Sequence, residues 1–348
     1  MKIPLSDGEE MEGRLVLPAL NAPKAIVVYI HGTGPATYLN KRKAGEKVFN
    51  FFDPFAEVFS KKGVGLFTYN KRGVTLADAP PTYEAVERAK FAHATPSKEV
   101  EDVKAAIRHL KQQHKGAKIV LFGWSEGTIL ATMVAEDKSV GVDALLLAGY
   151  ANENMYDIIK WQFSGESSVT NLSPYFDADN SRSITKVEYE SEDEKSKSFR
   201  TRSMRGATFE QLDVDKDGSI TSADFGVLAA PMYKAVLDAY SLGDEDWIWK
   251  NYFRVSLPWL REHFALEANK SRMLRLDQPI FIFQGRMDAS TPLDGASDKQ
   301  RRFELLGKKN LTLQIFDGHN HDLNYQDWIT KGELSPGIKA IFAALDQI

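Results

Sequence analysis

The clearest candidate for a catalytic residue is Ser125, which has a glycine two positions away on either side, in Gly123-Trp124-Ser125-Glu126-Gly127. It follows the apolar run KIVLF and precedes the apolar, helix-forming run TILATMVAE. A G-x-S-x-G motif recurs by chance, but between a strand and a helix it places the serine on a sharp turn with its Oγ exposed. The pattern therefore predicts Ser125 as the nucleophile of an acyl-transfer reaction.

A second glycine-rich turn, His31-Gly32-Thr33-Gly34, follows another apolar run. Acyl transfer needs two amide donors for the developing oxyanion, and glycine lets the backbone approach the substrate closely. We expect these donors to be the amides of Thr33 and Glu126. His31 precedes the serine, whereas the base comes last in the order serine, acid, histidine, so we expect His31 to brace the loop.

The acid and the base must come from the last third of the chain. Asp288 follows the apolar run PIFIFQ, where a carboxylate can orient a histidine, and Asp294 is the alternative. The segment DGHNHDL offers His319 and His321, and the order of the residues favours neither. The remaining histidines are interpreted as surface or packing residues: His93, His109, His114 and His263.

A metal-binding pattern occurs in residues 213–224, DVDKDGSITSAD. It matches a 12-residue EF-hand loop, with Gly218 at the sharp turn and Asp224 in place of the usual final glutamate. The shorter final side chain favours weaker calcium binding or a shift toward magnesium. The predicted ligands are Asp213, Asp215, Asp217, Ser219 and Asp224.

Residues 177–188, DADNSRSITKVE, repeat this pattern thirty-six positions earlier. Arg182 stands where the loop needs a glycine, in a left-handed conformation that costs a residue with a Cβ about 1–2 kcal/mol. We therefore expect a weakened first loop paired with a better second one. Its predicted ligands are Asp177, Asp179, Ser181, Ser183 and Glu188. One acidic run alone would often be only a solvated loop, but two at this spacing favour a pair of metal sites.

The elements that position these residues follow an alternating pattern. Short apolar runs at 24–31, 63–69, 117–122, 143–148 and 279–284 are typical of strands buried on both faces of a parallel sheet. Between them, residues 97–113 space their apolar side chains at helical intervals behind Ser97, the expected N-cap. Strands alternating with helices indicate a doubly wound α/β sheet.

The alternation stops near residue 150 and resumes near 275, which divides the chain into a core and an insertion. We expect the core in residues 1–150 and 273–348, and a helical cap in residues 151–272 that carries both acidic loops. The aromatic segment 247–264 is a candidate wall of the pocket, although such residues more often pack in a core.

Composition narrows the function. A net charge of -4 argues against nucleic acid or an anionic membrane as the main partner. No apolar run approaches the ~20 residues of a membrane span, and the first residues lack the apolar segment of a signal peptide. The absence of cysteine excludes disulfides, thiolate catalysis and zinc–thiolate sites.

The motifs HGTGP, YNKRGV, GWSEG, QGRMD and NHDL together resemble those of the bacterial α/β-hydrolase family of serine esterases and serine aminopeptidase-like hydrolases. The resemblance covers residues 1–150 and 273–348. It implies the α/β-hydrolase fold, no catalytic cofactor, and His321 as the base. Asn70 and Trp124 depart from the usual aspartate and histidine, and neither belongs to the predicted triad.

This resemblance implies a carboxylesterase that acts on a small-molecule ester. One alternative is an amide hydrolase or aminopeptidase, which needs a negative site for the substrate amine. The run Asp244, Glu245 and Asp246 could supply it, although solvation is its more frequent role. A second alternative is a calcium-dependent binding protein with an inactive core, against which the complete triad argues.

Residues 165–235 resemble EF-hand proteins, which implies calcium, or magnesium, as a structural ion of the cap. Millimolar calcium outside the cytoplasm would fill weak loops, which favours a periplasmic or secreted protein. The sequence does not predict the oligomeric state.

Overall fold

The computed structural model describes residues 1–19, 22–80 and 82–348. Eight of the described strands form one sheet in the order β1-β2-β6-β3-β9-β10-β13-β14. The ladders from β6 to β14 are parallel, and β1 and β2 run antiparallel at one edge. The strands are β1 (Lys2–Pro4), β2 (Glu10–Val16), β3 (Ala25–Ile30), β6 (Val64–Tyr69), β9 (Lys118–Trp124), β10 (Ala144–Ala148), β13 (Ile280–Gly285) and β14 (Leu311–Phe316).

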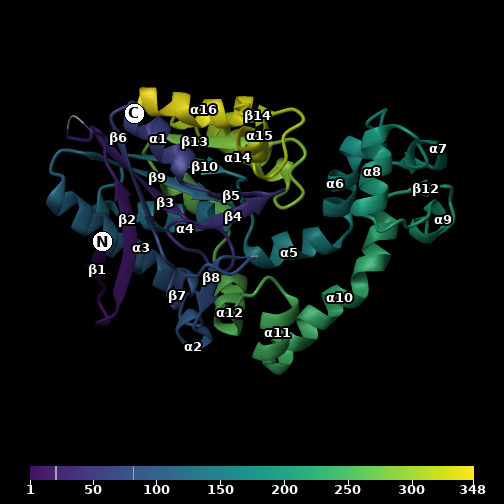
Figure 1. The fold of residues 1–348 in the computed structure, drawn as a ribbon, viewed down its shortest axis with the longest axis horizontal. Helices are drawn as coiled ribbons and strands as arrows, with labels where there is room; N and C mark the ends of the chain where they lie inside the picture. Colours follow the sequence, from purple (N-terminus) through teal and green to yellow (C-terminus); the bar gives the residue numbers. More distant parts are fainter. Residues whose placement is uncertain (20–21, 81) are drawn as a thin grey trace.

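Helices cover both faces of this sheet, because the central strands are apolar on both sides (Figure 1). In β3, Ile26 and Val28 face α3 and α4, whereas Val27 and Tyr29 face α1, α15 and α16. The core helices are α1 (Asp53–Lys61), α3 (Pro96–Gln113), α4 (Glu126–Glu136), α14 (Leu293–Leu305), α15 (Tyr325–Lys331) and α16 (Pro336–Ala344). The five predicted strands and the doubly wound arrangement are confirmed.

Helix α3 begins two residues earlier than a Ser97 N-cap predicts. Pro96 is its first residue and Thr95, in an extended conformation, is its N-cap. Proline suits the first helical position because it has no amide hydrogen to leave unpaired. The prediction of Ser97 as the N-cap was therefore wrong, while the predicted apolar face of this helix is buried.

Two small hairpins and a short helix accompany the core. They are β4 (Lys41–Ala44) with β5 (Lys47–Asn50), β7 (Val74–Leu76) with β8 (Glu84–Val86), and α2 (Arg88–Phe91).

The segment between β10 and β13 is almost entirely helical. Its helices near the core are α5 (Met155–Phe163), α11 (Glu245–Asn251), α12 (Leu257–Ala265) and α13 (Asn269–Arg272). Its outer part contains α6 (Glu166–Phe176), β11 (Ile184–Thr185), α7 (Lys186–Tyr189), α8 (Glu194–Arg202), α9 (Phe209–Leu212), β12 (Ser219–Ile220) and the start of α10 (Ser222–Leu242). Short 3-10 turns occupy Lys138–Val140, Met273–Arg275 and Leu345–Gln347.

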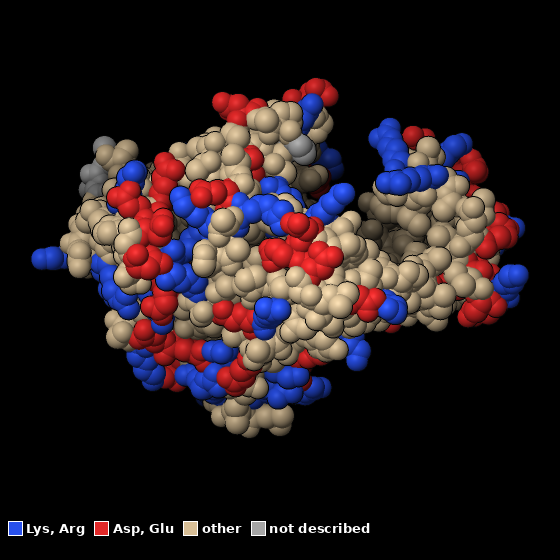
Figure 2. All heavy atoms as spheres, turned by 90° about the horizontal axis from the view of Figure 1, so that it is seen from below, with Lys and Arg blue, Asp and Glu red and all other residues tan. Residues whose placement is uncertain are grey.

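The outer part, residues 165–226, forms a lobe beside the core rather than a lid above the sheet (Figure 1). The chain enters it through α5 and returns along α10, and the lobe has its own apolar cluster around Phe176 and Ile220. A notch separates the lobe from the core on the face shown in Figure 2. On the same face, acidic side chains gather at the end of the lobe that lies farthest from the core.

No helix among the described residues is both long and apolar enough to cross a membrane.

Candidate active site and acidic loops

Ser125 lies at the turn between β9 and α4, in a conformation that a residue with a side chain rarely adopts (φ 58, ψ -126). The flanking glycines are sterically required. A Cβ at Gly127 would lie 2.2 Å from the Ile30 carbonyl oxygen, and one at Gly123 would lie 2.3 Å from the Gly127 oxygen. The turn that the motif predicts is therefore present, and its close packing against β3 allows no larger residue at either glycine.

Asp288 and His321 form a close hydrogen-bonded pair. Asp288 follows β13 and is 2% exposed, and His321 follows β14. Nδ1 of His321 lies 2.9 Å from Oδ1 and 2.8 Å from Oδ2 of Asp288. Because the carboxylate only accepts, Nδ1 carries the proton, and Nε2 is left as the basic nitrogen.

Asp288 is itself held in place by groups of its own loop and of β13. Thr291 donates to it from both its amide (2.9 Å) and its hydroxyl (2.7 Å), and Gln284 Nε2 donates at 2.8 Å. Burial alone raises the pKa of Asp288, but His321 and the two hydrogen bonds from Thr291 lower it more, so the net shift is downward. The carboxylate is therefore ionised and oriented.

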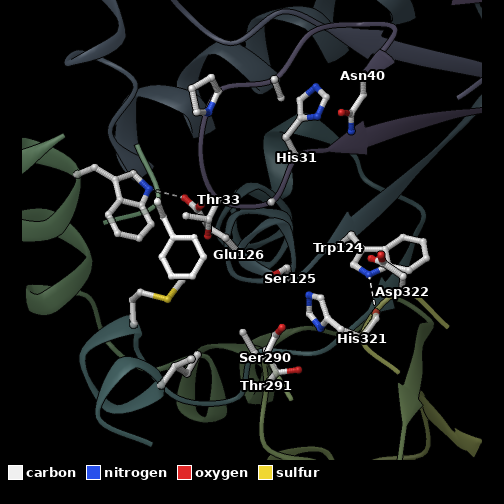
Figure 3. Close-up of a pocket in the computed structure, with 18 of the residues that line it drawn as sticks. His31, Thr33, Asn40, Trp124, Ser125, Glu126, Ser290, Thr291, His321 and Asp322 are labelled. Atoms are coloured by element: carbon white, nitrogen blue, oxygen red, sulfur yellow. Dashed lines mark hydrogen bonds between the residues drawn. The ribbon is translucent and has the colours of Figure 1, made fainter. Parts of the chain in front are cut away.

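Asp288 in turn raises the pKa of His321. Burial alone lowers it, but the charge and hydrogen bonds of Asp288 outweigh burial. Gly149 makes room for the ring: a Cβ there would lie 2.5 Å from Cε1 of His321. In Figure 3 the imidazole faces Ser125 across the pocket that both residues line.

The two alternatives from the sequence lie elsewhere. His319 is buried, with Nδ1 2.8 Å from the Asp317 carbonyl oxygen and Nε2 accepting from the Gly337 amide at 3.4 Å. Asp294 is exposed in the first turn of α14. The structure thus pairs Asp288 with His321, and neither Asp294 nor His319 takes part in this pair.

The predicted oxyanion donors both border the nucleophile. A Cβ at Gly32 would lie 3.3 Å from Cβ of Ser125, and Thr33 and Glu126 line the same pocket. Among the described residues, neither the Thr33 amide nor the Glu126 amide donates to a protein acceptor. The Glu126 amide is the first of α4, where helical amides are free to bind an anion.

The pocket around Ser125 has a volume of about 300 Å³, and polar side chains share its lining with aromatic and aliphatic ones. One wall comes from the core, through Phe51 and Trp124, and the other comes from the insertion. The insertion supplies Met155, Ile158, Gln162, Tyr252, Phe253 and Trp259. The predicted wall from the aromatic segment 247–264 is confirmed for three of these residues, whereas Trp249 packs against Phe91.

Sequence reasoning missed the side chain of Glu126, which joins the core to helix α12 of the insertion. Its Oε1 accepts from the Trp259 indole at 2.7 Å and from His263 Nε2 at 2.8 Å, and all three groups are buried. Burial raises its pKa, but Lys71, His263 and Trp259 together lower the pKa to about 2. The only sequence signal is that Trp259 and His263 lie four residues apart, on one face of α12.

The two acidic loops of the lobe face each other through a short antiparallel ladder. β11 pairs with β12, with Ile184 opposite Ile220. Within each loop three carboxylates can present oxygens within 4.8 Å of one another, and these are Asp177, Asp179 and Glu188 in the first and Asp213, Asp215 and Asp224 in the second.

The loops also share their hydrogen bonds, position by position. The first aspartate accepts from the sixth amide in both, at 3.2 Å from Arg182 and 3.1 Å from Gly218. The final carboxylates accept from the second and ninth amides. Arg182 (φ 61) adopts the left-handed conformation of Gly218 (φ 91), so the arginine does not prevent the first loop from forming.

Several predicted ligands make other contacts. Asp217 lies outside the second carboxylate group, and its Oδ1 accepts from the Ser219 amide at 2.8 Å. Ser181 Oγ donates to the Ser183 carbonyl oxygen at 3.1 Å. In contrast, Oδ1 of the buried Asp177 has no hydrogen-bond partner, which leaves one carboxylate oxygen of the first loop unsatisfied.

The insertion contacts the loop after Asp288 at two backbone oxygens, once from the lobe and once from α5. Ser167 Oγ, in the first turn of α6, donates to Ala289 O at 2.5 Å. Gln162 Nε2, on α5, donates to Ser290 O at 2.8 Å. Both acceptors directly follow Asp288 in the sequence.

Solved structures show the same fold at low sequence identity. A thermostable carboxyl esterase from Bacillus coagulans superposes with a TM-score of 0.56 at 13% identity, covering 100% of this chain and 97% of that one. Est1E from Butyrivibrio proteoclasticus, with ferulic acid bound, gives a TM-score of 0.52 at 13% identity, covering 100% and 98%.

Sequence comparison adds the family. Esterase EstD from Thermotoga maritima is 27% identical over 133 residues, which are 38% of this chain and only 29% of the length of that relative. The model of the serine aminopeptidase family S33 matches residues 21–212, more than half of the chain. The chain therefore has the α/β-hydrolase fold and belongs to the serine aminopeptidase S33 family.

Proposed function

We propose that the protein is a carboxylesterase that cleaves small or medium acyl esters through Ser125, His321 and Asp288. The observation that carries this proposal is the doubly hydrogen-bonded pair of Asp288 and His321 in the pocket of the strained Ser125. The names of the similar proteins, a carboxyl esterase and Esterase EstD, agree with it.

In the proposed mechanism, Ser125 Oγ attacks the ester carbonyl while Nε2 of His321 takes its proton. Asp288 holds the tautomer and stabilises the imidazolium that forms. The Thr33 and Glu126 amides bind the oxyanion. His321 then protonates the leaving alcohol, and a water molecule activated by the same ring releases the acid from Ser125.

The pocket favours a small acyl group. Its volume of about 300 Å³ lies at the lower end for ligand sites, and the insertion lines it with the apolar side chains of Met155, Ile158 and Phe253. Among the described residues that line it, the charged side chains are Arg42, Glu126 and Asp322.

The direct test compares ester hydrolysis by the wild type and by Ser125→Ala with p-nitrophenyl acetate and butyrate. We expect kcat to fall by about five to six powers of ten in the variant. A fluorophosphonate should label the wild type and not the variant, which would also exclude a binding protein with an inactive core. Ser139→Ala, on an exposed turn remote from the pocket, is the matched control. Near-normal turnover by Ser125→Ala would refute the proposal.

Amide hydrolysis is the second candidate, because the family name and the shared triad allow it. The acidic run at residues 244–246, the candidate site for a substrate amine, makes structural contacts instead. Asp244 caps α11, Glu245 accepts from the Leu257 amide at 2.6 Å, and Asp246 pairs with Arg88. A panel of aminoacyl p-nitroanilides beside the esters would separate the two: we expect kcat/KM to be higher for the esters.

We further propose that the paired loops of the lobe bind calcium, or magnesium, as a structural ion. The unsatisfied Asp177 Oδ1 and the matching hydrogen bonds of the two loops support this proposal. Carboxylate and carbonyl oxygens are the ligands that these hard cations prefer. No group of the lobe lines the pocket, so the ion would order the lobe and take no part in the acyl transfer.

A further inference from the structure

Lys71 is a buried cation directly behind the loop that carries Thr33. It belongs to the YNKRGV segment after β6, and its side chain is 3% exposed. Its Nζ donates to the Gly32 carbonyl oxygen at 2.8 Å and pairs with Glu99 Oε2 at 3.1 Å. The mechanism above assigns no role to this ammonium group, although burying a charge is costly unless it is paired and hydrogen-bonded.

The Lys71 ammonium can affect the Thr33 amide because its acceptor is the adjacent Gly32 carbonyl oxygen. The Gly32 carbonyl and the Thr33 amide belong to one peptide unit, and in a planar trans peptide the C=O and N–H bonds point in opposite directions. A donor that fixes Gly32 O therefore also fixes the Thr33 N–H, on the opposite side. The Thr33 side of this unit borders the pocket of Ser125.

The surrounding charges keep Lys71 protonated. Burial alone lowers its pKa, but the carboxylates of Glu99, on α3, and Glu126, on α4, raise it more. Glu99 is in turn oriented by the Tyr69 hydroxyl, which donates to its Oε1 at 2.7 Å. A protonated amine bound to a carbonyl oxygen polarises the whole peptide and makes its N–H a stronger donor.

The neighbours of Lys71 hold the rest of the same loop. His31 Nε2 donates to the Tyr69 carbonyl oxygen at 2.8 Å, since a carbonyl oxygen only accepts. Burial lowers the pKa of His31 to about 3, so the ring is neutral. The Lys71 amide donates to Ala36 O at 3.0 Å, and Asn70 Oδ1 accepts from the Tyr38 amide at 2.8 Å. Of these contacts, only the Lys71 ammonium acts on the peptide unit that carries the Thr33 amide.

We propose that Lys71, oriented by Glu99, is a positioning residue that aims and polarises the Thr33 amide toward the oxyanion. The proposal rests on the proposed function, since it needs Ser125 to form a tetrahedral oxyanion. It predicts a contribution to the transition state and little to the binding of the ground state.

Lys71→Met tests this, because methionine keeps most of the buried chain and removes the charge and the donor. We expect kcat for p-nitrophenyl acetate to fall about 10- to 100-fold, with KM within about threefold. The affinity for a trifluoromethyl ketone, which forms an oxyanion on Ser125, should fall by a similar factor. Inhibition by a neutral alcohol product, which brings no anionic oxygen to the Thr33 amide, should stay unchanged.

The matched control is Lys299→Met. Lys299 is also a buried lysine that donates to a backbone carbonyl oxygen, that of Lys270, but it lies on α14 away from the pocket. This variant should lose stability and keep its kcat. An equal loss of kcat in both variants, or a parallel loss of ketone and product binding in Lys71→Met, would overturn the proposal.

A second variant guards against misfolding. A cavity of about 520 Å³ reaches Lys71 and Glu99 from the side away from Ser125, so a small amine can enter the space left in Lys71→Ala. Ethylammonium should restore part of kcat in a saturable way, and tetramethylammonium, which has no N–H group, should not. Equal rates with and without ethylammonium would contradict the proposal.

Failure of the proposed function would look different. In that case the wild type and Ser125→Ala would hydrolyse esters alike, before any comparison at Lys71. If the natural substrate is instead an amide, the rate at which a fluorophosphonate labels Ser125 still reports the oxyanion site. That rate should fall in Lys71→Met and not in Lys299→Met.

Discussion

Both carboxylate oxygens of Asp288 lie within 2.9 Å of Nδ1 of His321. Replacing Asp288 by Asn keeps the shape but presents the ring with an amide, which no longer fixes the tautomer. We expect kcat/KM to fall by about three to four powers of ten, with the fold retained. Steady-state kinetics and circular dichroism check this, with Asp294→Asn as the control. A similar loss in Asp294→Asn would contradict the assignment of the acid.

The same pair determines the pH dependence. His321 must be neutral to accept the serine proton, and Asp288 raises its pKa above the usual 6.5. Activity should therefore fall as the pH drops through a midpoint above 6.5, the raised pKa of His321. In the residual activity of Asp288→Asn the midpoint should move to lower pH, because the charge that favours the imidazolium is gone. A kcat/KM profile of both enzymes measures the shift, and an unchanged midpoint would contradict it.

Alanine substitutions of the two histidines in the DGHNHDL segment should have different effects on kcat and on stability. His321→Ala removes the base and should reduce kcat by about five to six powers of ten. His319→Ala removes a buried ring that accepts from the Gly337 amide, so it should lower the melting temperature and leave kcat within about tenfold. Kinetics and thermal unfolding of the two variants test this. The reverse pattern would assign the base to His319.

Loss of the hydrogen bond between Trp259 and Glu126 should lower the stability of the protein and weaken substrate binding. Trp259→Phe keeps an aromatic wall but removes one donor from a buried carboxylate, which costs about 1–3 kcal/mol of unfolding free energy. We also expect a higher KM, since Trp259 lines the pocket. Trp249→Phe, outside the pocket lining among the described residues, is the control and should leave KM unchanged. Denaturant unfolding and steady-state kinetics provide the two readouts.

Calcium should raise the melting temperature, and EGTA should lower it. At a free concentration about a hundred times the dissociation constant, a bound ion adds about 2.7 kcal/mol to the unfolding free energy. Calorimetric titration should show two ions in the wild type and one each in Asp177→Asn and Asp213→Asn. Asp246→Asn, in an acidic run outside the loops, should keep both. If EGTA changes neither stability nor activity, the metal proposal fails.

The sequence predicts the core well because its signals are local. A strand buried on both faces is an unbroken apolar run, and the turn at Ser125 requires glycines at fixed spacing, so both can be recognised without knowing the fold. The N-cap of α3 was misplaced by two residues because Thr95 and Ser97 are both good caps, and only the preference of proline for the first helical position separates them.

Contacts between distant segments could not be predicted in this way. Lys71 meets Gly32 across 39 residues, and His263 meets Glu126 across 137. Neither contact has a pattern of spacing, because each depends on how three-dimensional packing brings buried polar groups together. The acidic loops were recognised from their own residues, but the position of their lobe beside the core depends on the direction in which α5 and α10 leave it (Figure 1).

Gly149 sets a limit on how this enzyme can change. The imidazole of His321 occupies the space that any side chain at this position would need, and the backbone there has a positive φ of 55. A single substitution at this position, outside the proposed triad, would therefore displace the proposed base. The opposite wall of the pocket belongs to the insertion, whose side chains carry no such steric restriction on the ring. Mutational libraries that seek new substrates should hold position 149 fixed and vary Met155, Ile158 and Phe253.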